Sequence, residues 1–149
     1  MINRLTIGTG SLIFLFACVF VCHGADCSIP GTSISMPSHT FHAGDLCELR
    51  VVFCNTGSDP LYNHPLFVVL TILGEYWFAP EWTRGEDGFT HFTLTFPPGT
   101  KEQLVLPEFS WPVTGTSFSG ALFIAAVTDP VYDHVVGDIA SWEFSWSDW

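Results

Sequence analysis

The chain contains two stretches in which almost every side chain is apolar. Residues 66–73 read LFVVLTIL, with one polar residue, and residues 120–128 read GALFIAAVT. Both are far shorter than the roughly 20 residues of a membrane-spanning helix, and the first is rich in β-branched side chains. We therefore expect two neighbouring strands at the centre of the fold, the first of them buried on both faces.

Other stretches alternate between apolar and polar side chains, which is typical of strands with one buried face. In residues 46–55, the alternation places Cys47, Leu49, Val51 and Phe53 on one face. Further strands are predicted at residues 33–36, 89–96, 101–109 and 139–146. Seven or eight short strands with turn signals between them, and no helical period after the N-terminal stretch, predict an all-β fold: a single immunoglobulin-like antiparallel β-sandwich.

Residues 1–24 have the features of a secretory signal peptide. Arg4 supplies a positive charge, an apolar run follows, and Gly24 lies at a small-residue cleavage site. We expect an N-terminal segment over residues 25–40 and a sandwich domain over residues 41–149, secreted or held at the cell surface.

Two alternatives to cleavage remain open. The apolar run could stay as a membrane anchor if it extended back to Ile7. Residues 15–18 also loosely fit a lipid-attachment motif, which would make the protein a lipoprotein anchored through Cys18. We place cleavage after Gly24 or Ala25 and expect no stable membrane span after it.

Composition limits the classes of partner. Hydrophobic residues make up 48% of the chain, so a substantial core is possible without a metal or cofactor. Four Lys and Arg against 15 Asp and Glu give a net charge of −11. This charge repels phosphates, so nucleic acid and anionic membrane surfaces are not expected partners. It is compatible with a protein or a polysaccharide at the cell surface.

Three cysteines remain after the predicted signal peptide, an odd number for an oxidising compartment. Cys47 and Cys54 lie on one predicted strand, roughly 23 Å apart and on opposite faces, so they cannot form a bond with each other. Cys27 could reach either. We favour Cys27–Cys54, with Cys27–Cys47 and no bridge as the alternatives. The chain has no Cys-x-x-Cys motif that would indicate a zinc or redox site.

Asp129, Asp133 and Asp138 crowd one predicted turn. Carboxylates in loops between strands suit Ca²⁺, which prefers oxygen ligands. Their spacing matches no defined calcium loop, so solvated turn carboxylates are the alternative to a calcium site.

Motifs for catalysis are weak. Residues 115–120 come near a Gly-x-Ser-x-Gly motif but lack its strand–turn–helix context. Glu75, Glu81 and Glu108 stand near tryptophans and could imitate the carboxylate pair of a glycosidase. A chain of this size rarely builds a substrate cleft, so we expect no enzyme activity and no cofactor.

Aromatic side chains are the strongest candidates for binding. They could form an exposed platform that stacks on sugar rings or anchors a protein partner, and core filling is the alternative. The candidate residues are Tyr76, Trp77, Phe78, Trp82 and Trp111.

Residues 41–146 resemble the immunoglobulin-like modules of bacterial surface proteins, notably the adhesion-related CARDB domain. The resemblance lies in FHAGDLCELRVVFCNTG and PPGTKEQLVLPEFSWP, where Asn55 and Gly57 fall at the family's Asn-x-Gly turn. It implies a binding or spacer role without chemistry. We expect a non-enzymatic module for adhesion, assembly or protein binding, and the alternative is a carbohydrate-binding module that uses an aromatic platform.

Overall fold

The computed structural model describes residues 27–148, in which the only regular secondary structure is β-strand. The strands are β1 (Gly31–Ser35), β2 (Thr40–His42), β3 (Leu46–Asn55), β4 (Leu61–Ile72), β5 (Glu75–Phe78), β6 (Thr83–Arg84), β7 (Phe92–Phe96), β8 (Gly99–Ser110), β9 (Phe118–Val127) and β10 (Ala140–Ser147). No helix within residues 27–148 has the length and apolar character needed to cross a membrane. The predicted signal peptide and its alternatives lie outside the described residues.

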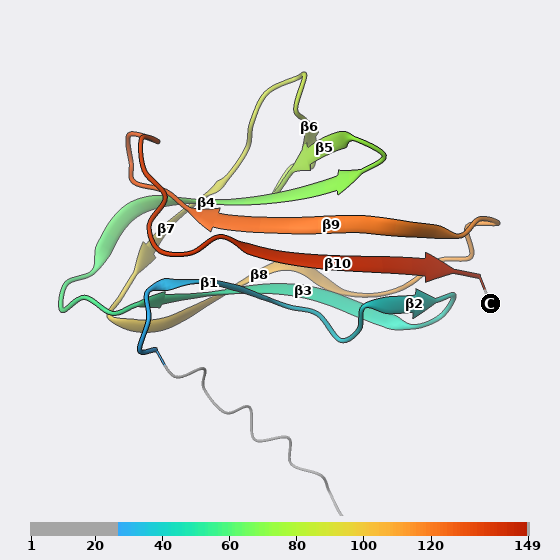
Figure 1. Cartoon of the computed structure of the whole chain (residues 1–149), viewed down its shortest axis with the longest axis horizontal. Coiled ribbons are helices and arrows are strands. Elements are labelled where there is room, and N and C mark those ends of the chain that lie inside the picture. Colours follow the sequence, from blue (N-terminus) through green and yellow to red (C-terminus); the bar gives the residue numbers. More distant parts are fainter. Residues whose placement is uncertain (1–26, 149) are drawn as a thin grey trace, which may run out of the picture.

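The strands form two sheets that pack face to face, as the sequence predicts. Sheet A has the order β1-β3-β8, and sheet B has the order β2-β10-β9-β4-β5-β6, with β7 also paired to β4. Figure 1 shows β4, β9 and β10 of sheet B above β1, β3 and β8 of sheet A. Neighbours are antiparallel except β2 and β10, which are parallel. The β-sandwich is confirmed.

Residues 27–148 contain ten strands, where the sequence pattern indicates seven or eight. The unpredicted strands are β2, β5 and β6, which have three, four and two residues. Such short strands contain too few residues to display an alternation of period two. β1 and the first residue of β2 fall within residues 25–40 and pair with β3 and β10, so this N-terminal segment contributes strands to both sheets.

The core lies between the inner faces of the two sheets. The predicted inward side chains of β3 are all at most 1% exposed: Cys47, Leu49, Val51 and Phe53. From sheet B they meet buried side chains of β4 and β9, among them Val68 and Phe123. Aromatic contacts join the layers and strands, with ring centroids 4.7 Å apart for Phe53 and Phe96.

The predicted central pair of strands is confirmed, because β4 lies beside β9 from Leu66 to Thr71. The prediction that β4 is buried on both faces is wrong. Leu66 and Val68 point into the core and are at most 1% exposed, whereas Phe67 and Val69 on the opposite face are only half-buried. The outer side of sheet B is not covered by another layer among residues 27–148.

Pro107 does not interrupt β8, which runs unbroken from Gly99 to Ser110. The strand tolerates proline because it is an edge strand of sheet A, where a missing N–H breaks no ladder on the outer side. The register with β3 instead shifts on either side of Leu49, which pairs with Leu106.

Asn55 is the only buried polar residue among those described, and it secures the turn after β3. Its Nδ2 donates to the carbonyl oxygens of Asp59 (2.9 Å) and Phe96 (3.1 Å), and its Oδ1 accepts from the Gly57 N–H (2.9 Å). A Cβ at position 57 would lie 3.1 Å from that Oδ1, which accounts for glycine there. The Asn-x-Gly turn thus joins β3 to the end of β7.

We expect Asn55→Ala to lower the free energy of unfolding by about 2–3 kcal/mol, because it leaves three backbone groups without their partner. Urea denaturation followed by tryptophan fluorescence would measure the loss. Asn55→Asp keeps the acceptor for Gly57 but loses both donors and sets a carboxylate against two carbonyl oxygens, so it should be at least as damaging. An Asn55→Asp chain as stable as the wild type would contradict this account of the turn.

The favoured disulfide is confirmed: Cys27 and Cys54 are bonded. Cys54 points away from the core and Cys47 into it, so the two cysteines of β3 lie on opposite faces as predicted. Cys47 is free and buried. Burial, with a smaller contribution from the negative charge of Glu48, raises the pKa of the Cys47 thiol to about 11.

Candidate functional site

The outer face of sheet A is largely polar, with the apolar side chains of Val52 and Leu104 among charged ones. Arg50 of β3 donates through Nε to Glu48 Oε1 at 2.7 Å and also bonds Glu102 of β8. The hydrogen bond from Arg50 lowers the pKa of the Glu48 carboxyl, with the guanidinium charge acting in the same direction against desolvation. Ser33 and Ser35 of β1 pair with Val52 and Arg50 on this face. Such a surface is typical of a sandwich face that meets water.

The outer face of sheet B is apolar across three neighbouring strands. Phe67 and Val69 of β4 pair with Ala126 and Ile124 of β9, and Val69 also pairs with Phe78 of β5. Paired residues point to the same side of a sheet, so these side chains form one continuous surface. We call it the outer apolar face, and its members are all half-buried: Phe67, Val69, Phe78, Leu122, Ile124 and Ala126.

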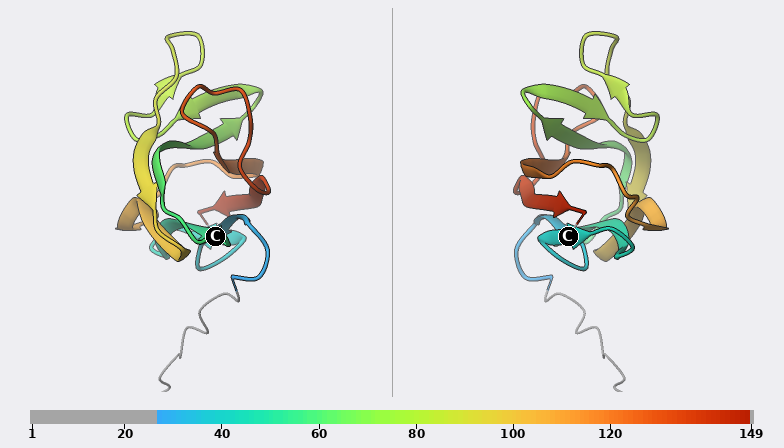
Figure 2. Two further views of the ribbon diagram at one scale, coloured as in Figure 1. Left: turned by 90° about the vertical axis from the view of Figure 1, so that its left-hand side faces the viewer. Right: turned by 90° about the vertical axis from the view of Figure 1, so that its right-hand side faces the viewer.

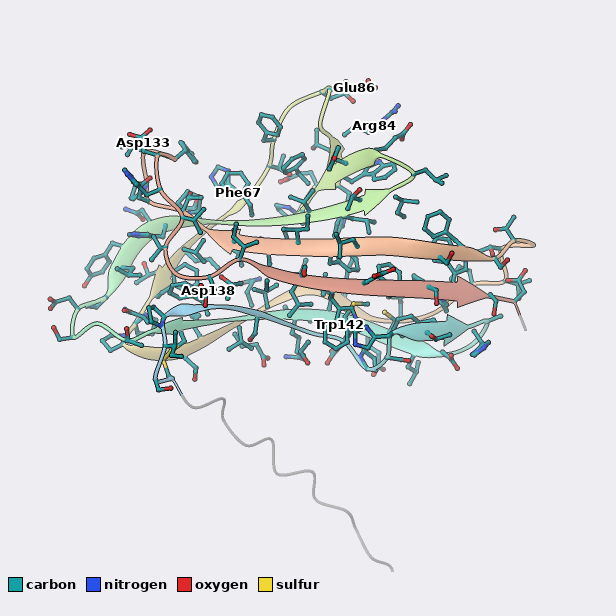
Figure 3. All side chains as sticks on the ribbon, viewed as in Figure 1. Phe67, Arg84, Glu86, Asp133, Asp138 and Trp142 are labelled. Carbon is teal, nitrogen blue, oxygen red and sulfur yellow. A yellow bond between two sulfur atoms is a disulfide. The ribbon has the colours of Figure 1, made fainter. Side chains whose placement is uncertain are left out.

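Two loops add aromatic rings to this face. His91 precedes β7 and lies with its ring centroid 5.1 Å from that of Phe67, and Tyr132 from the loop between β9 and β10 lies 6.1 Å from Phe67. The His91 and Tyr132 rings are also in contact, at 5.7 Å. Both loops stand at the top of the two end-on views in Figure 2. Figure 3 shows Phe67 between the loop that carries Asp133 and the loop that carries Glu86.

Hydrogen bonds fix the loop that carries Tyr132. The Asp129 carboxylate accepts from the Asp133 N–H (2.9 Å) and lies 3.3 Å from Nδ1 of His134. Desolvation acts to raise the pKa of the Asp129 carboxyl, but the hydrogen bonds from Asp133 and His134 outweigh it and lower the pKa. Tyr132 has φ +64°, a conformation that costs energy for a residue with a Cβ. The loop therefore holds Tyr132, 56% exposed, against Phe67.

The loop between β6 and β7 is fixed in a similar way. The Thr90 hydroxyl donates to the Phe78 carbonyl at 2.7 Å, and Phe89 packs against Phe78 with ring centroids 4.9 Å apart. Phe89 is still 69% exposed. Large apolar side chains thus continue the outer apolar face beyond the edge of β5.

The five aromatic residues singled out from the sequence do not form one platform. Tyr76 and Phe78 point to the outer side of sheet B, since they pair with Thr71 and Val69. Trp77 pairs with Leu70 and points to the opposite side. Trp82 packs against the core residue Phe123 at 6.2 Å, and Trp111 is also packed against the core, where it contacts Phe41 and Phe109.

The structure does not assemble the calcium candidates into a ligand set. Within residues 27–148, no group of three His, Cys, Asp or Glu side chains is placed to hold a metal ion. Asp129 is engaged with Asp133 and His134, and Asp138 lies beside Gly31, whose neighbour Thr32 donates its N–H to the Asp138 carbonyl. The Asp129 carboxylate thus stabilises the turn, to which Asp133 and Asp138 contribute backbone hydrogen bonds.

The three glutamates considered for catalysis are also dispersed. Glu75 forms an ion pair with Arg84 at 2.8 Å on the β5–β6 hairpin. Glu81 follows β5 in sheet B, and Glu108 is in β8 of sheet A. Beside the first pair lies a hollow of about 230 Å³, lined in part by Tyr76 and Glu86.

Of the residues that define the outer apolar face, sequence reasoning singled out Phe78 and missed the others. Phe67, Val69 and Ile124 are assigned to a core by their apolar neighbours, and nothing in the pattern relates His91 or Tyr132 to them. A signal was present, because residues 66–73 and 120–128 are apolar at both odd and even positions. In a sandwich of two sheets, a strand has only one inner face, so the second apolar row had to face outward.

Comparisons with known proteins concern the fold. No protein-family profile matches the sequence, and no curated protein matches it. A solved structure that is similar is the crystal structure of the CARDB domain of the PF1109 protein from Pyrococcus furiosus, described as a complex with di-metal ions. The two are 16% identical, the match covers 80% of this chain and 90% of that chain, and the TM-score is 0.49.

Proposed function

We propose that the protein is a non-enzymatic binding module of the cell exterior that docks a protein partner on the outer apolar face of sheet B. Export is supported by the charged, apolar and small-residue pattern of residues 1–24 and by the disulfide, which is stable in an oxidising compartment. In this proposal the sandwich is a rigid scaffold for the outer apolar face, and a partner protein binds to that face.

The contrast between the two outer faces carries the proposal. The outer face of sheet A intersperses the apolar side chains of Val52 and Leu104 with ion pairs and serines, whereas the outer face of sheet B has aliphatic and aromatic side chains paired across neighbouring strands. The chain itself only half-buries the side chains of the outer apolar face, so a partner can cover further apolar area. Contiguous apolar surface that stays partly accessible to solvent is typical of a docking site.

Ring geometry favours a protein partner over a sugar. A sugar platform needs rings that lie flat beside one another, but the Phe67, His91 and Tyr132 planes are inclined by 45–69° to each other. Tilted aromatic rings among aliphatic side chains instead resemble the anchor pockets of protein interfaces. The carbohydrate alternative has its best location at the β5–β6 hollow, where Tyr76 is 51% exposed beside Arg84 and Glu86.

The test is selection of binding peptides from a random library displayed on phage, with the wild-type protein as bait. We expect the selected peptides to lose affinity about tenfold or more when the face carries Phe67→Ser and Ile124→Ser, because the removed side chains supply the central apolar contacts. Biolayer interferometry with the synthetic peptides would measure the change.

The matched control is the pair Val52→Ser and Leu104→Ser, which removes apolar side chains from the outer face of sheet A. It should leave peptide affinity unchanged. Peptides that bind both double variants as well as the wild type, or a library that yields no binders at micromolar affinity, would refute docking on this face. Retention on polysaccharide that is lost with Tyr76→Ala would support the carbohydrate alternative instead.

A further inference from the structure

We infer that the occupant of the outer apolar face is a cationic amphipathic segment of another protein, with Lys or Arg set among aliphatic or aromatic side chains. This inference rests on the proposed function and adds the chemistry of the partner. It follows from the acidic side chains that border the face. It also follows from the positions of the Lys and Arg side chains in residues 27–148, which do not balance that negative charge.

Acidic side chains border the outer apolar face on two sides. Glu143 of β10 is exposed and pairs with Leu122, so it lies directly beside the face. Asp133 is exposed next to Tyr132, at the tip of the loop labelled in Figure 3. Asp87 is exposed on the loop that carries Phe89. A partner that covers the apolar centre therefore meets carboxylates at its margin.

The cations of the described chain are not available to balance these carboxylates. Arg50 and Lys101 belong to β3 and β8 of sheet A. Arg84 is the cation of sheet B within residues 27–148, and it is held by Glu75 at 2.8 Å and Glu86 at 3.1 Å. The margin of the face is therefore negative, in a protein whose net charge is −11.

This charge distribution discriminates between occupants. A second copy of the chain would set one acidic margin against another, and a nucleic acid or an anionic membrane would be repelled. Lys and Arg side chains suit the site for two reasons. Their aliphatic stems can cover Val69 and Ile124 while the charged groups reach Glu143 and Asp133, and the rings of Phe67 and Tyr132 attract cations over their faces.

The test uses two synthetic amphipathic peptides of about 14 residues, one of Leu and Lys at helical spacing and one with Glu in place of each Lys. Isothermal titration calorimetry at low and at high salt would measure both. We expect the Leu/Lys peptide to bind the wild type and the Leu/Glu peptide to bind at least tenfold more weakly. Affinity for the Leu/Lys peptide should fall as salt increases.

Paired variants distinguish local recognition from general attraction to an acidic protein. Asp133→Asn with Glu143→Gln should weaken the Leu/Lys peptide several-fold, whereas Asp59→Asn with Glu108→Gln, which removes the same charge elsewhere, should have little effect. Equal losses with both pairs would overturn the inference, and so would a Leu/Lys peptide that binds the Phe67→Ser, Ile124→Ser protein as well as the wild type.

Two other outcomes also overturn it. If the Leu/Glu peptide binds as tightly as the Leu/Lys peptide and both depend on Phe67 and Ile124, the face docks proteins but does not select cations, so the proposed function stands alone. If neither peptide binds, the cationic partner is refuted, and the phage selection decides separately whether the face docks any peptide.

Discussion

Replacing Phe53 with alanine is expected to lower the free energy of unfolding by about 3–5 kcal/mol. Phe53 is 1% exposed, lies near the C-terminal end of β3, and contacts Phe96 of β7 with ring centroids 4.7 Å apart. It therefore joins sheet A to sheet B. Truncation removes the transfer free energy of the ring and leaves a cavity between two sheets whose backbones are fixed by their ladders.

Urea denaturation with tryptophan fluorescence would measure this loss from the shift of the midpoint at constant m-value. Phe89→Ala is the matched control, since Phe89 is 69% exposed and contacts only Phe78 among the ring pairs of the described chain. It should cost about 1 kcal/mol or less. Equal losses for the two substitutions would mean that the layers do not meet at Phe53.

The sequence predicts correctly those strands whose pattern is set by burial of one face against the core. β3 has the predicted bounds, because a sheet with water on one side and core on the other imposes a strict alternation from Leu46 to Asn55. β10 shows the same effect: Phe144 is buried, and Trp142 and Trp146 pack against the core from the same face. Adjacency of β4 and β9 follows from their shared apolar character.

The sequence cannot show what covers the second face of a strand that is apolar on both faces. An apolar residue on a second face means either a further layer of the same chain or a surface for another molecule. For Phe67 and Ile124, only the coordinates show that this second layer is missing from residues 27–148. The same ambiguity applies to the aromatic candidates, because Trp82 and Trp111 pack against the core while Tyr76 faces outward.

Contacts between distant loops are a second limit. Phe67, His91 and Tyr132 meet because β7 begins and β9 ends beside Leu66 of β4. That arrangement depends on strand order, and turn residues specify only local direction. The sequence therefore predicted the chemical type of the candidate site, an aromatic surface, but of its residues only Phe78.

Loss of the Cys27–Cys54 bond is the second change with a large expected effect. The two cysteines are 27 residues apart, and the bond ties the start of the described chain to β3. Closing a loop of this length removes conformational entropy from the unfolded chain that corresponds to about 3–4 kcal/mol. We expect the Cys27→Ala, Cys54→Ala protein to lose stability of this order in urea denaturation, and reduction of the wild type to lower its midpoint to the same value.

Cys47 provides the control. It is buried and free, so Cys47→Ala should cost about 1 kcal/mol, and the variant should stay as sensitive to reduction as the wild type. In an unreduced tryptic digest of the Cys47→Ala protein, the peptide that ends at Arg50 carries Cys27 and the peptide that starts at Val51 carries Cys54. The two peptides should remain linked. A link that vanishes with Cys47→Ala but survives Cys27→Ala would place the bond elsewhere. A midpoint that reduction leaves unchanged would show that the sheets, and not the covalent bond, hold β1 against β3.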